Sequence, residues 1–471
     1  MTSLQSGNQG HVLEECYAYT GRDVGQLSSQ RNLLIVFITP ACSPPWSPLS
    51  PLSTTTFVNM HAQTLLLALS STAFAARPFL NEPDTGIEEA LGGLFTGGRS
   101  SAEAPLSAAA LSNDSAPGQP PNDSGQLPNV TAMVSLHDFD WLARKHLPIK
   151  SYTYYRNGAA GEWSYRNNLE VFRRYRLKPR VLRDISKIQS TLPTSILGHN
   201  FSAPFYISPC ARGALGHPDA ELNFVKAAAA QGILYMPALF ADKTIEEIAK
   251  EKGPDQVLFQ QLYMTGNETA DKEFISRTEA ANAAAIVFTV DSAADGNRHR
   301  AARFDVGSAD PDYSTFTWEF YEQLKTMTKL PIILKGIMHV EDAHEAVKRN
   351  AAAIILSNHG GRQLDGAPSA LEVALEIKKE APEVFGSATE VFADGGVRYG
   401  ADALMLLSLG VKAVGIGRPF MYANVLGQPG VERAITLMKN ELALDAGNLG
   451  VADLQKLQDD IVDWTPNNWM G

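Results

Sequence analysis

Eight short apolar runs recur between residues 203 and 418 of this chain, and stretches with apolar residues at helical spacing separate most of them. The runs are "APFYISP" (203–209), "GILYMPA" (232–238), "VLFQQLY" (257–263), "AAIVFTVD" (284–291), "PIILKG" (331–336), "AAIILSN" (352–358), "EVFADGG" (390–396) and "AVGIGR" (413–418). Continuous apolar runs joined by helices predict parallel strands that are buried on both faces. Eight such units predict an α/β fold, the (β/α)8 or TIM barrel. An open doubly wound sheet is the alternative, but no GxGxxG motif follows the first run.

The N-terminal third lacks this pattern and divides into three segments. Residues 1–59 include "PPWSPLSPLSTTT" and are predicted to be a disordered leader. Residues 60–75 have an apolar core followed by a small-x-small site, which predicts a signal peptide starting at Met60; a chance apolar stretch is the alternative. Residues 76–134 have the composition of a low-complexity linker. Residues 135–471 are then the barrel domain, and its first helix is predicted in "DFDWLARKHL", starting at Asp138.

Composition and charge narrow the classes of function. The formal net charge is −11 and no basic patch is present, so nucleic acid is not an expected partner. The run "NLLIVFITP" at 32–40 is too short to span a bilayer. The three cysteines form no CxxC pair, so neither a zinc site nor a disulfide framework is expected. A signal peptide would direct the chain to the secretory pathway or the exterior. N-glycosylation sequons give weak support for this destination. The sequons begin at Asn113, Asn122, Asn129, Asn200 and Asn267.

Polar residues gather where the predicted strands end. They are Gln261, Tyr263, Asp291, Lys335, Asn358, His359, Asp394, Gly395, Gly396, Gly417 and Arg418. In a TIM barrel the carboxyl ends of all strands meet at one face, and that face holds the active site. These side chains are therefore predicted to converge.

The stretch "SNHGGRQLDG" (357–366) resembles the signature of the FMN-dependent 2-hydroxy acid dehydrogenases and oxidases, a family that includes glycolate oxidase, the lactate oxidases and the lactate dehydrogenase flavocytochromes. The resemblance runs from about Ser135 to Val462, in matching order and spacing, through "YTYYRNGAAGEWSYRNN", "LKPRVLRDIS", "HPDAE", "FQQLY", "TVD", "ILKGI", "DGGVRYG" and "GIGRPF". It implies bound FMN and oxidation of a small L-2-hydroxy acid to the 2-oxo acid. It further implies oxygen or an external electron acceptor, and a homo-oligomer.

The chemistry of that reaction suggests a role for several of these residues. His359 is the candidate base, because imidazole titrates near neutral pH, and Asp291 would stabilise the imidazolium. Arg362 offers a planar fork for the substrate carboxylate, and Gly360 and Gly361 would let the backbone approach the ligands. The resemblance implies the same roles for His359 and Arg362. It also adds substrate contacts at Tyr154, Tyr263, Arg298 and Phe240, the last shaping the side-chain pocket.

The expected cofactor contacts come from several strand ends. Lys335 would favour the reduced flavin electrostatically; a Schiff-base lysine is the competing interpretation. The phosphate is expected at the loops after the seventh and eighth strands, where glycines and two arginines occur. The complete predicted set is Pro209, Cys210, Ala211, Gln261, Thr289, Lys335, Ser357, Asp394, Gly395, Gly396, Arg398, Gly417 and Arg418, and no metal is expected.

Some positions depart from the family, and other functions stay open. Cys210 stands where a small polar residue is usual, Ala238 replaces a serine, and the loop "SAADGNRHRAAR" lacks the usual Pro and paired "GRR". The heme-domain "HPGG" is absent. A monooxygenase that decarboxylates the oxo acid is the alternative within flavin chemistry. A phosphate-binding barrel isomerase and a catalytically silent barrel are the alternatives from other classes.

Overall fold

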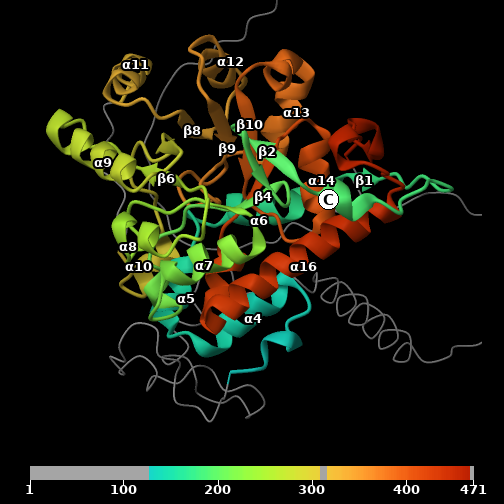
Figure 1. The fold of residues 1–471 in the computed structure, drawn as a ribbon, viewed down its shortest axis with the longest axis horizontal. Helices are drawn as coiled ribbons and strands as arrows, with labels where there is room; N and C mark the ends of the chain where they lie inside the picture. The colour runs from blue at the N-terminus through green and yellow to red at the C-terminus, as the bar shows by residue number, and fades with distance from the viewer. Residues whose placement is uncertain (1–126, 308–315, 467–471) are drawn as a thin grey trace, which may run out of the picture. The chain divides into compact units, whose positions relative to one another are not determined.

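The computed structural model describes residues 127–307 and 316–466 (Figure 1). The predicted leader, the predicted signal peptide and the predicted linker up to residue 126 lie outside the described residues. The sequons at Asn113 and Asn122 lie outside them as well. None of the helices in the two described ranges combines the length and the apolarity that crossing a membrane requires.

The eight predicted strands are confirmed, each within or one residue beyond its apolar run. They are β4 (Phe205–Ile207), β5 (Leu234–Tyr235), β6 (Phe259–Leu262), β7 (Ala285–Thr289), β8 (Ile332–Ile337), β9 (Ala353–Leu356), β10 (Glu390–Asp394) and β11 (Ala413–Ile416). All pairings are parallel, in the order β5-β4-β11-β10-β9-β8-β7-β6. A parallel bridge between Tyr235 and Leu258 joins the two outer strands. The sheet therefore closes into the barrel that the sequence predicted, and the open-sheet alternative is wrong.

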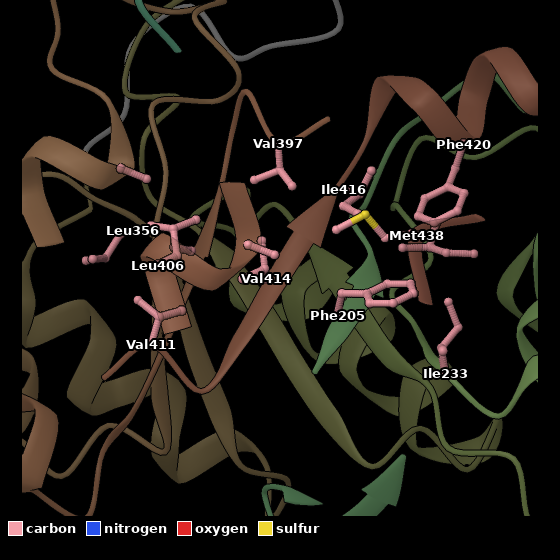
Figure 2. Packing of buried hydrophobic residues seen from close by; sticks show 14 of the residues in the cluster. Phe205, Ile233, Leu356, Val397, Leu406, Val411, Val414, Ile416, Phe420 and Met438 are labelled. Carbon is pink, nitrogen blue, oxygen red and sulfur yellow. The ribbon is translucent and has the colours of Figure 1, made fainter. Parts of the chain in front are cut away.

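Both faces of each strand are buried because they pack on two different cores. Along β4, Tyr206 points into the barrel, whereas Phe205 and Ile207 belong to the outer core beneath the helices. The inner core includes Leu234, Phe259, Val287, Ile333, Ile355, Phe392 and Ala413. Figure 2 shows part of the outer core, in which Phe205 and Ile416 lie beside Phe420 and Met438. Alternating residues thus face apolar surroundings on either side, which explains the continuous apolar runs.

The helices surround this sheet in the order expected of strand–helix units (Figure 1). They are α7 (Glu221–Gln231), α8 (Ile245–Lys250), α9 (Glu268–Ala280), α10 (His299–Arg303), α11 (Trp318–Met327), α12 (Val340–Lys348), α13 (Ala370–Glu380), α14 (Gly400–Ser408), α15 (Arg418–Ala423) and α16 (Gly427–Asn448). Short 3-10 helices lie at Val130–Ala132, Val171–Arg174, Ile188–Thr191, Gly213–Leu215, Pro382–Gly386, Asn424–Leu426, Leu454–Lys456 and Asp459–Ile461.

Three helices precede the barrel: α4 (Leu136–His146), α5 (Ile149–Arg156) and α6 (Trp163–Glu170). The first begins two residues before the predicted Asp138, because Asp138 acts from inside the first turn: its carboxylate accepts a hydrogen bond of 2.9 Å from the Ser135 N–H. An acidic third residue that reaches back to the N-cap in this way is a capping box.

A hairpin closes the N-terminal end of the barrel. It consists of β2 (Thr194–Ile196) and β3 (His199–Phe201), and its Ile196 and Phe201 join the inner core. The Leu197 N–H donates to Glu390, the first residue of β10. A second small sheet pairs β1 (Arg176–Leu177) with β12 (Val462–Asp463). With the N-terminal end plugged, the carboxyl ends of the strands are the end that can receive a ligand.

Candidate active site

A cavity of about 980 Å³, part of it open to solvent, lies at the carboxyl ends of the barrel strands. Of the predicted residues, Asp291, Ser357, Asn358 and Gly361 do not line it. The predicted residues that do line it are Tyr154, Pro209, Cys210, Ala211, Phe240, Gln261, Tyr263, Thr289, Arg298, Lys335, His359, Gly360, Arg362, Asp394, Gly395, Gly396, Arg398, Gly417 and Arg418. The structure therefore brings the predicted residues together on one side of the barrel.

His359 lies in the cavity wall with one ring nitrogen already engaged. Its Nδ1 is 2.7 Å from Asp291 Oδ1, so Nε2 is the ring nitrogen left for a ligand. The residue has a φ of +58°, a left-handed conformation that is uncommon outside glycine. Its backbone N–H donates to Ser357 Oγ over 3.1 Å.

Asp291 and Ser357 lie directly behind the cavity wall and connect its charged residues. The Lys335 ammonium is 3.4 Å from Asp291 Oδ2 and 3.1 Å from Ser357 Oγ. Ser357 in turn donates to Asp394 Oδ1 over 2.6 Å. Burial raises the pKa of Asp291, but the charges of His359 and Lys335 outweigh burial and lower that pKa to about 2. Burial lowers the pKa of Lys335, and the carboxylates of Asp291 and Asp394 raise it above its ordinary value. Both groups are therefore ionised at neutral pH.

This arrangement predicts a specific pH dependence of stability. A carboxyl whose pKa falls from 3.8 unfolded to about 2 folded stabilises the fold above about pH 4, and this contribution is lost as the pH falls towards 2. Replacement of Asp291 by Asn should therefore lower the free energy of unfolding by about 2 kcal/mol at pH 6. The difference from wild type should shrink below pH 4, as measured by urea unfolding. A difference that is independent of pH would contradict the ion pairing.

Arg362 and Tyr154 form the next part of the wall. The guanidinium carbon of Arg362 lies 5.3 Å from the centroid of the Tyr154 ring, within cation–π distance. The Arg298 Nε donates to the Arg362 carbonyl over 3.2 Å, and its terminal nitrogen also donates to the Gln363 side chain. Burial raises the pKa of Tyr154, which keeps its hydroxyl protonated. Two guanidiniums and a phenol hydroxyl at one place suit a carboxylate ligand.

The remaining wall offers an aromatic surface and a neutral thiol. Phe240 and Tyr263 stack with ring centroids 5.3 Å apart and an interplanar angle of 25°. Ala238 also lines the cavity. Burial raises the pKa of Cys210 to about 11, so the thiol stays protonated and is a poor nucleophile.

The residues present fit a flavin mononucleotide. The Ser208 hydroxyl is buried in the cavity lining and makes no hydrogen bond to any described residue, so it can bond a ligand. Gly395 and Gly396, also in the cavity lining, have φ of +105° and +85°. A Cβ on Gly396 would lie 1.8 Å from the Asn168 carbonyl oxygen, so only glycine gives this loop its course. Arg398 supplies a cation beside that loop, as a phosphate requires.

Two of the predicted residues, Arg418 and Gly361, have packing roles that the sequence prediction did not include. Arg418 lines the cavity, but its guanidinium donates to the carbonyls of Tyr155, Asn157 and Gly360 over 2.8, 2.8 and 3.0 Å. It therefore clamps the His359 loop to the end of α5. Gly361 does not line the cavity. A Cβ there would lie 2.5 Å from the Tyr165 nitrogen, so the glycine permits packing on α6 rather than approach to a ligand.

Some cavity residues were missed by the sequence prediction: Ser208, Val397, Gly415 and Ile416. Ser208 directly precedes the predicted Pro209, at the end of the first apolar run. Its position at a strand end was the available signal. The other three are apolar or glycine, and nothing in their residue type marks them as site residues.

Comparisons with known proteins agree with this geometry. The sequence model of the FMN-dependent dehydrogenase family matches residues 143–312 and 307–464. The L-lactate dehydrogenase (cytochrome) of Saccharomyces cerevisiae is 33% identical over 366 residues, which cover 72% of this chain and 62% of that protein. Human 2-hydroxyacid oxidase 1 is 33% identical over 367 residues, covering 71% of this chain and 97% of that protein. The chain thus spans 62% of the length of the cytochrome-linked relatives.

Solved structures show the same likeness. The recombinant flavin-binding domain of baker's yeast flavocytochrome b2 superposes with a TM-score of 0.70 at 33% identity, over 73% of this chain and 90% of that one. A mandelate oxidase variant with benzaldehyde gives 0.65 at 34% identity, over 70% of this chain and 98% of that one. These matches disfavour a phosphate-binding barrel without flavin. The chain belongs to the family of FMN-dependent dehydrogenases, whose cofactor is FMN.

Proposed function

We propose that this protein oxidises a small L-2-hydroxy acid to the 2-oxo acid and passes the electrons to oxygen or an external acceptor. The observation that carries the proposal is the shared cavity of His359, paired with buried Asp291, and the guanidinium of Arg362. An enzyme for this reaction needs a base for the proton and an anchor for the carboxylate, and these residues supply both.

His359 is the proposed base, and its Nε2 accepts the proton from the substrate. The resulting imidazolium is stabilised by the Asp291 carboxylate, 2.7 Å from Nδ1 and buried, where a charge acts more strongly than in water. Because Asp291 stays ionised, it also holds the Nδ1 proton and the orientation of the ring.

Arg362, Arg298 and Tyr154 are proposed to bind the substrate carboxylate. The Arg298 Nε donates to the Arg362 backbone carbonyl, so the Arg298 side chain is held beside the Arg362 backbone. Tyr263 is proposed to contact the substrate hydroxyl, and Phe240, stacked on it, to bound the substrate side chain. A substrate held at both ends keeps its C2 atom near the base, which lowers the entropic part of the barrier.

Lys335 and its neighbours are proposed to hold FMN. When bound, FMN supplies the acceptor for the two electrons that leave the substrate. The buried ammonium of Lys335 favours negative charge beside it. Contacts to the flavin ring are proposed for Pro209, Cys210, Ala211, Ser208, Gln261 and Thr289, the last two joined by a hydrogen bond of 2.9 Å. Asp394 is proposed for the ribityl hydroxyls, and Gly395, Gly396, Arg398 and Gly417 for the phosphate.

The test is the colour of the purified protein. It should absorb near ~450 nm as flavins do, and lose that absorbance anaerobically when L-lactate, glycolate or a larger L-2-hydroxy acid is added. D-lactate is the matched control and should leave the colour unchanged. Product analysis under oxygen then separates release of the oxo acid from its decarboxylation. A colourless protein that FMN does not reconstitute, or a yellow one that no 2-hydroxy acid bleaches, would refute the proposal.

Self-association is proposed on the basis of an exposed apolar patch. Val181, Leu182, Ile185 and Leu444 are 80%, 100%, 36% and 64% exposed. The Ile185 side chain lies against α16 near Gly447, so the loop and the helix form one surface. Exposed basic residues surround the loop (Lys178, Arg183 and Lys187), and the chain as a whole carries a net charge of −11. A second copy would supply both apolar and acidic surface. A molar mass of a single chain in light scattering would contradict this.

Entry into the secretory pathway is proposed from the candidate signal peptide that starts at Met60. The sequon residues Asn129, Asn200 and Asn267 are all exposed, so each can carry a glycan without displacing the core. N-terminal sequencing and glycosidase treatment of the native protein test the proposal. A mature chain that starts near Met1 and carries no glycan would reject it.

A further inference from the structure

The carboxylate of Glu162, between α5 and α6, is buried with two guanidiniums. Its side chain is 1% exposed, and those of Arg156 and Arg300 are 3% and 5% exposed. Arg300 bonds it with both arms, Nε to Oε1 and Nη2 to Oε2, each over 2.9 Å. Arg156 bonds it once, Nη1 to Oε2 over 3.2 Å. The Gly158 N–H adds a bond of 2.9 Å to Oε1.

The two-armed bond fixes a short helix that cannot fix itself. Arg300 is the second residue of α10, which has only five residues and begins directly after Arg298. A helix of this length is not stable alone in water. Just before it, the Asn297 carbonyl accepts a bond of 2.6 Å from the Ala160 N–H. The segment around Glu162 therefore holds the chain on both sides of Arg298.

Arg298 connects the segment around Glu162 with the cavity. It lines the cavity and donates from Nε to the Arg362 carbonyl. The same segment also holds the loop of Arg362 directly, because the Ala159 N–H donates to the Gly361 carbonyl over 2.8 Å. Both arginines proposed for the substrate carboxylate thus depend on the turn that contains Glu162.

The opposite charges of Glu162 and Arg300 keep this pair in one arrangement. Burial raises the pKa of Glu162, but bonds and charges from Arg300 and Arg156 outweigh it and lower that pKa below its ordinary value. The carboxylate is therefore ionised at neutral pH. Bidentate guanidinium–carboxylate bonds constrain orientation as well as distance, which a single bond does not.

We propose that Glu162 and Arg300 are positioning residues for substrate binding: their buried two-armed bond sets the start of α10, and so places Arg298 and Arg362 to bind the substrate carboxylate. The inference rests on the proposed function. Arg156 has a different part, because it balances the buried carboxylate from α5 and lies outside the helix that follows Arg298.

The test compares Arg300→Lys with Arg156→Lys in the FMN-loaded protein. Both variants keep the buried positive charge and leave Glu162 paired with the other arginine, but only Arg300→Lys loses the two-armed bond. The readout is the dissociation constant of oxalate, an unreactive carboxylate, followed by the change in flavin absorbance. We expect Arg300→Lys to bind oxalate about 10-fold more weakly or worse, because small displacements of positioning groups have effects of that size. Arg156→Lys should change the constant less than about twofold.

Two measurements keep the outcomes distinct. FMN content and the thermal unfolding midpoint are recorded for each variant, and Glu162→Gln, alone and with Arg300→Lys, completes a double-mutant cycle. If the losses of oxalate affinity in the two single variants are not additive in the double variant, Glu162 and Arg300 act as a pair. Normal oxalate binding by Arg300→Lys, or equal weakening by both lysine variants, would overturn the inference. If wild type is bleached by no 2-hydroxy acid, the proposed function fails instead.

Discussion

Replacement of His359 by Gln is expected to slow reduction of the bound flavin by L-2-hydroxy acids about 100-fold or more, the usual contribution of a positioned base. Glutamine keeps a polar side chain of similar length but accepts no proton at neutral pH. The loss should appear in the rate of reduction rather than in cofactor binding, because the described bonds of His359 go to Asp291, Ser292 and Ser357. In the variant, no group beside the Asp291 carboxylate can accept the proton from the substrate.

Anaerobic stopped-flow measurement of flavin bleaching at saturating substrate gives this rate. The matched control is His344→Gln on α12, because His344 is half-exposed, pairs with Glu383 and does not line the cavity. The control should reduce its flavin at the wild-type rate. A His359→Gln protein that holds FMN and is reduced within a few-fold of wild type would reject the base.

The fold could be predicted because each strand has its own apolar signal. Ile354 and Leu356 face the outer core, and Ala353 and Ile355 the inner one, so "AAIILSN" is apolar at every strand position. Parallel order then follows from the helices between the runs. Closure depends on the bridge between Tyr235 and Leu258, which no local pattern contains, and was inferred only from the number of strands.

The candidate site could be predicted where residue type and strand end coincide, as for Lys335, His359 and Asp394. Contacts between distant segments could not. Glu162 and Arg300 are 138 positions apart, and neither lies at a strand end. Arg418 does follow a strand, yet its partners are carbonyls on α5 and the His359 loop. A guanidinium can donate to an anion or to a backbone carbonyl, so the sequence alone does not decide between them.

Replacement of Arg362 by Lys is expected to weaken substrate binding about 10- to 100-fold. The lysine keeps the charge but loses the planar fork, and so gives up at least one charge-assisted hydrogen bond to the carboxylate. Such a bond contributes about 1.5–3 kcal/mol. The contact of the guanidinium with the Tyr154 ring, 5.3 Å away, would be weakened as well. The rate of flavin reduction at saturating substrate should fall less than the affinity, because His359 and its pairing with Asp291 are untouched.

The dependence of the bleaching rate on substrate concentration separates affinity from rate. Arg349→Lys is the matched control, since Arg349 forms its ion pairs with glutamates at the surface and does not line the cavity. Removal of the charge by Arg362→Met should weaken binding further than Arg362→Lys, because the carboxylate would then lose both fork and charge. Unchanged substrate affinity in Arg362→Lys would show that the carboxylate lies elsewhere in the cavity. In that case Arg298, fixed from the Glu162 side, would be the next guanidinium to test, since Arg398 follows the loop proposed for the phosphate and Arg418 is bonded to carbonyls.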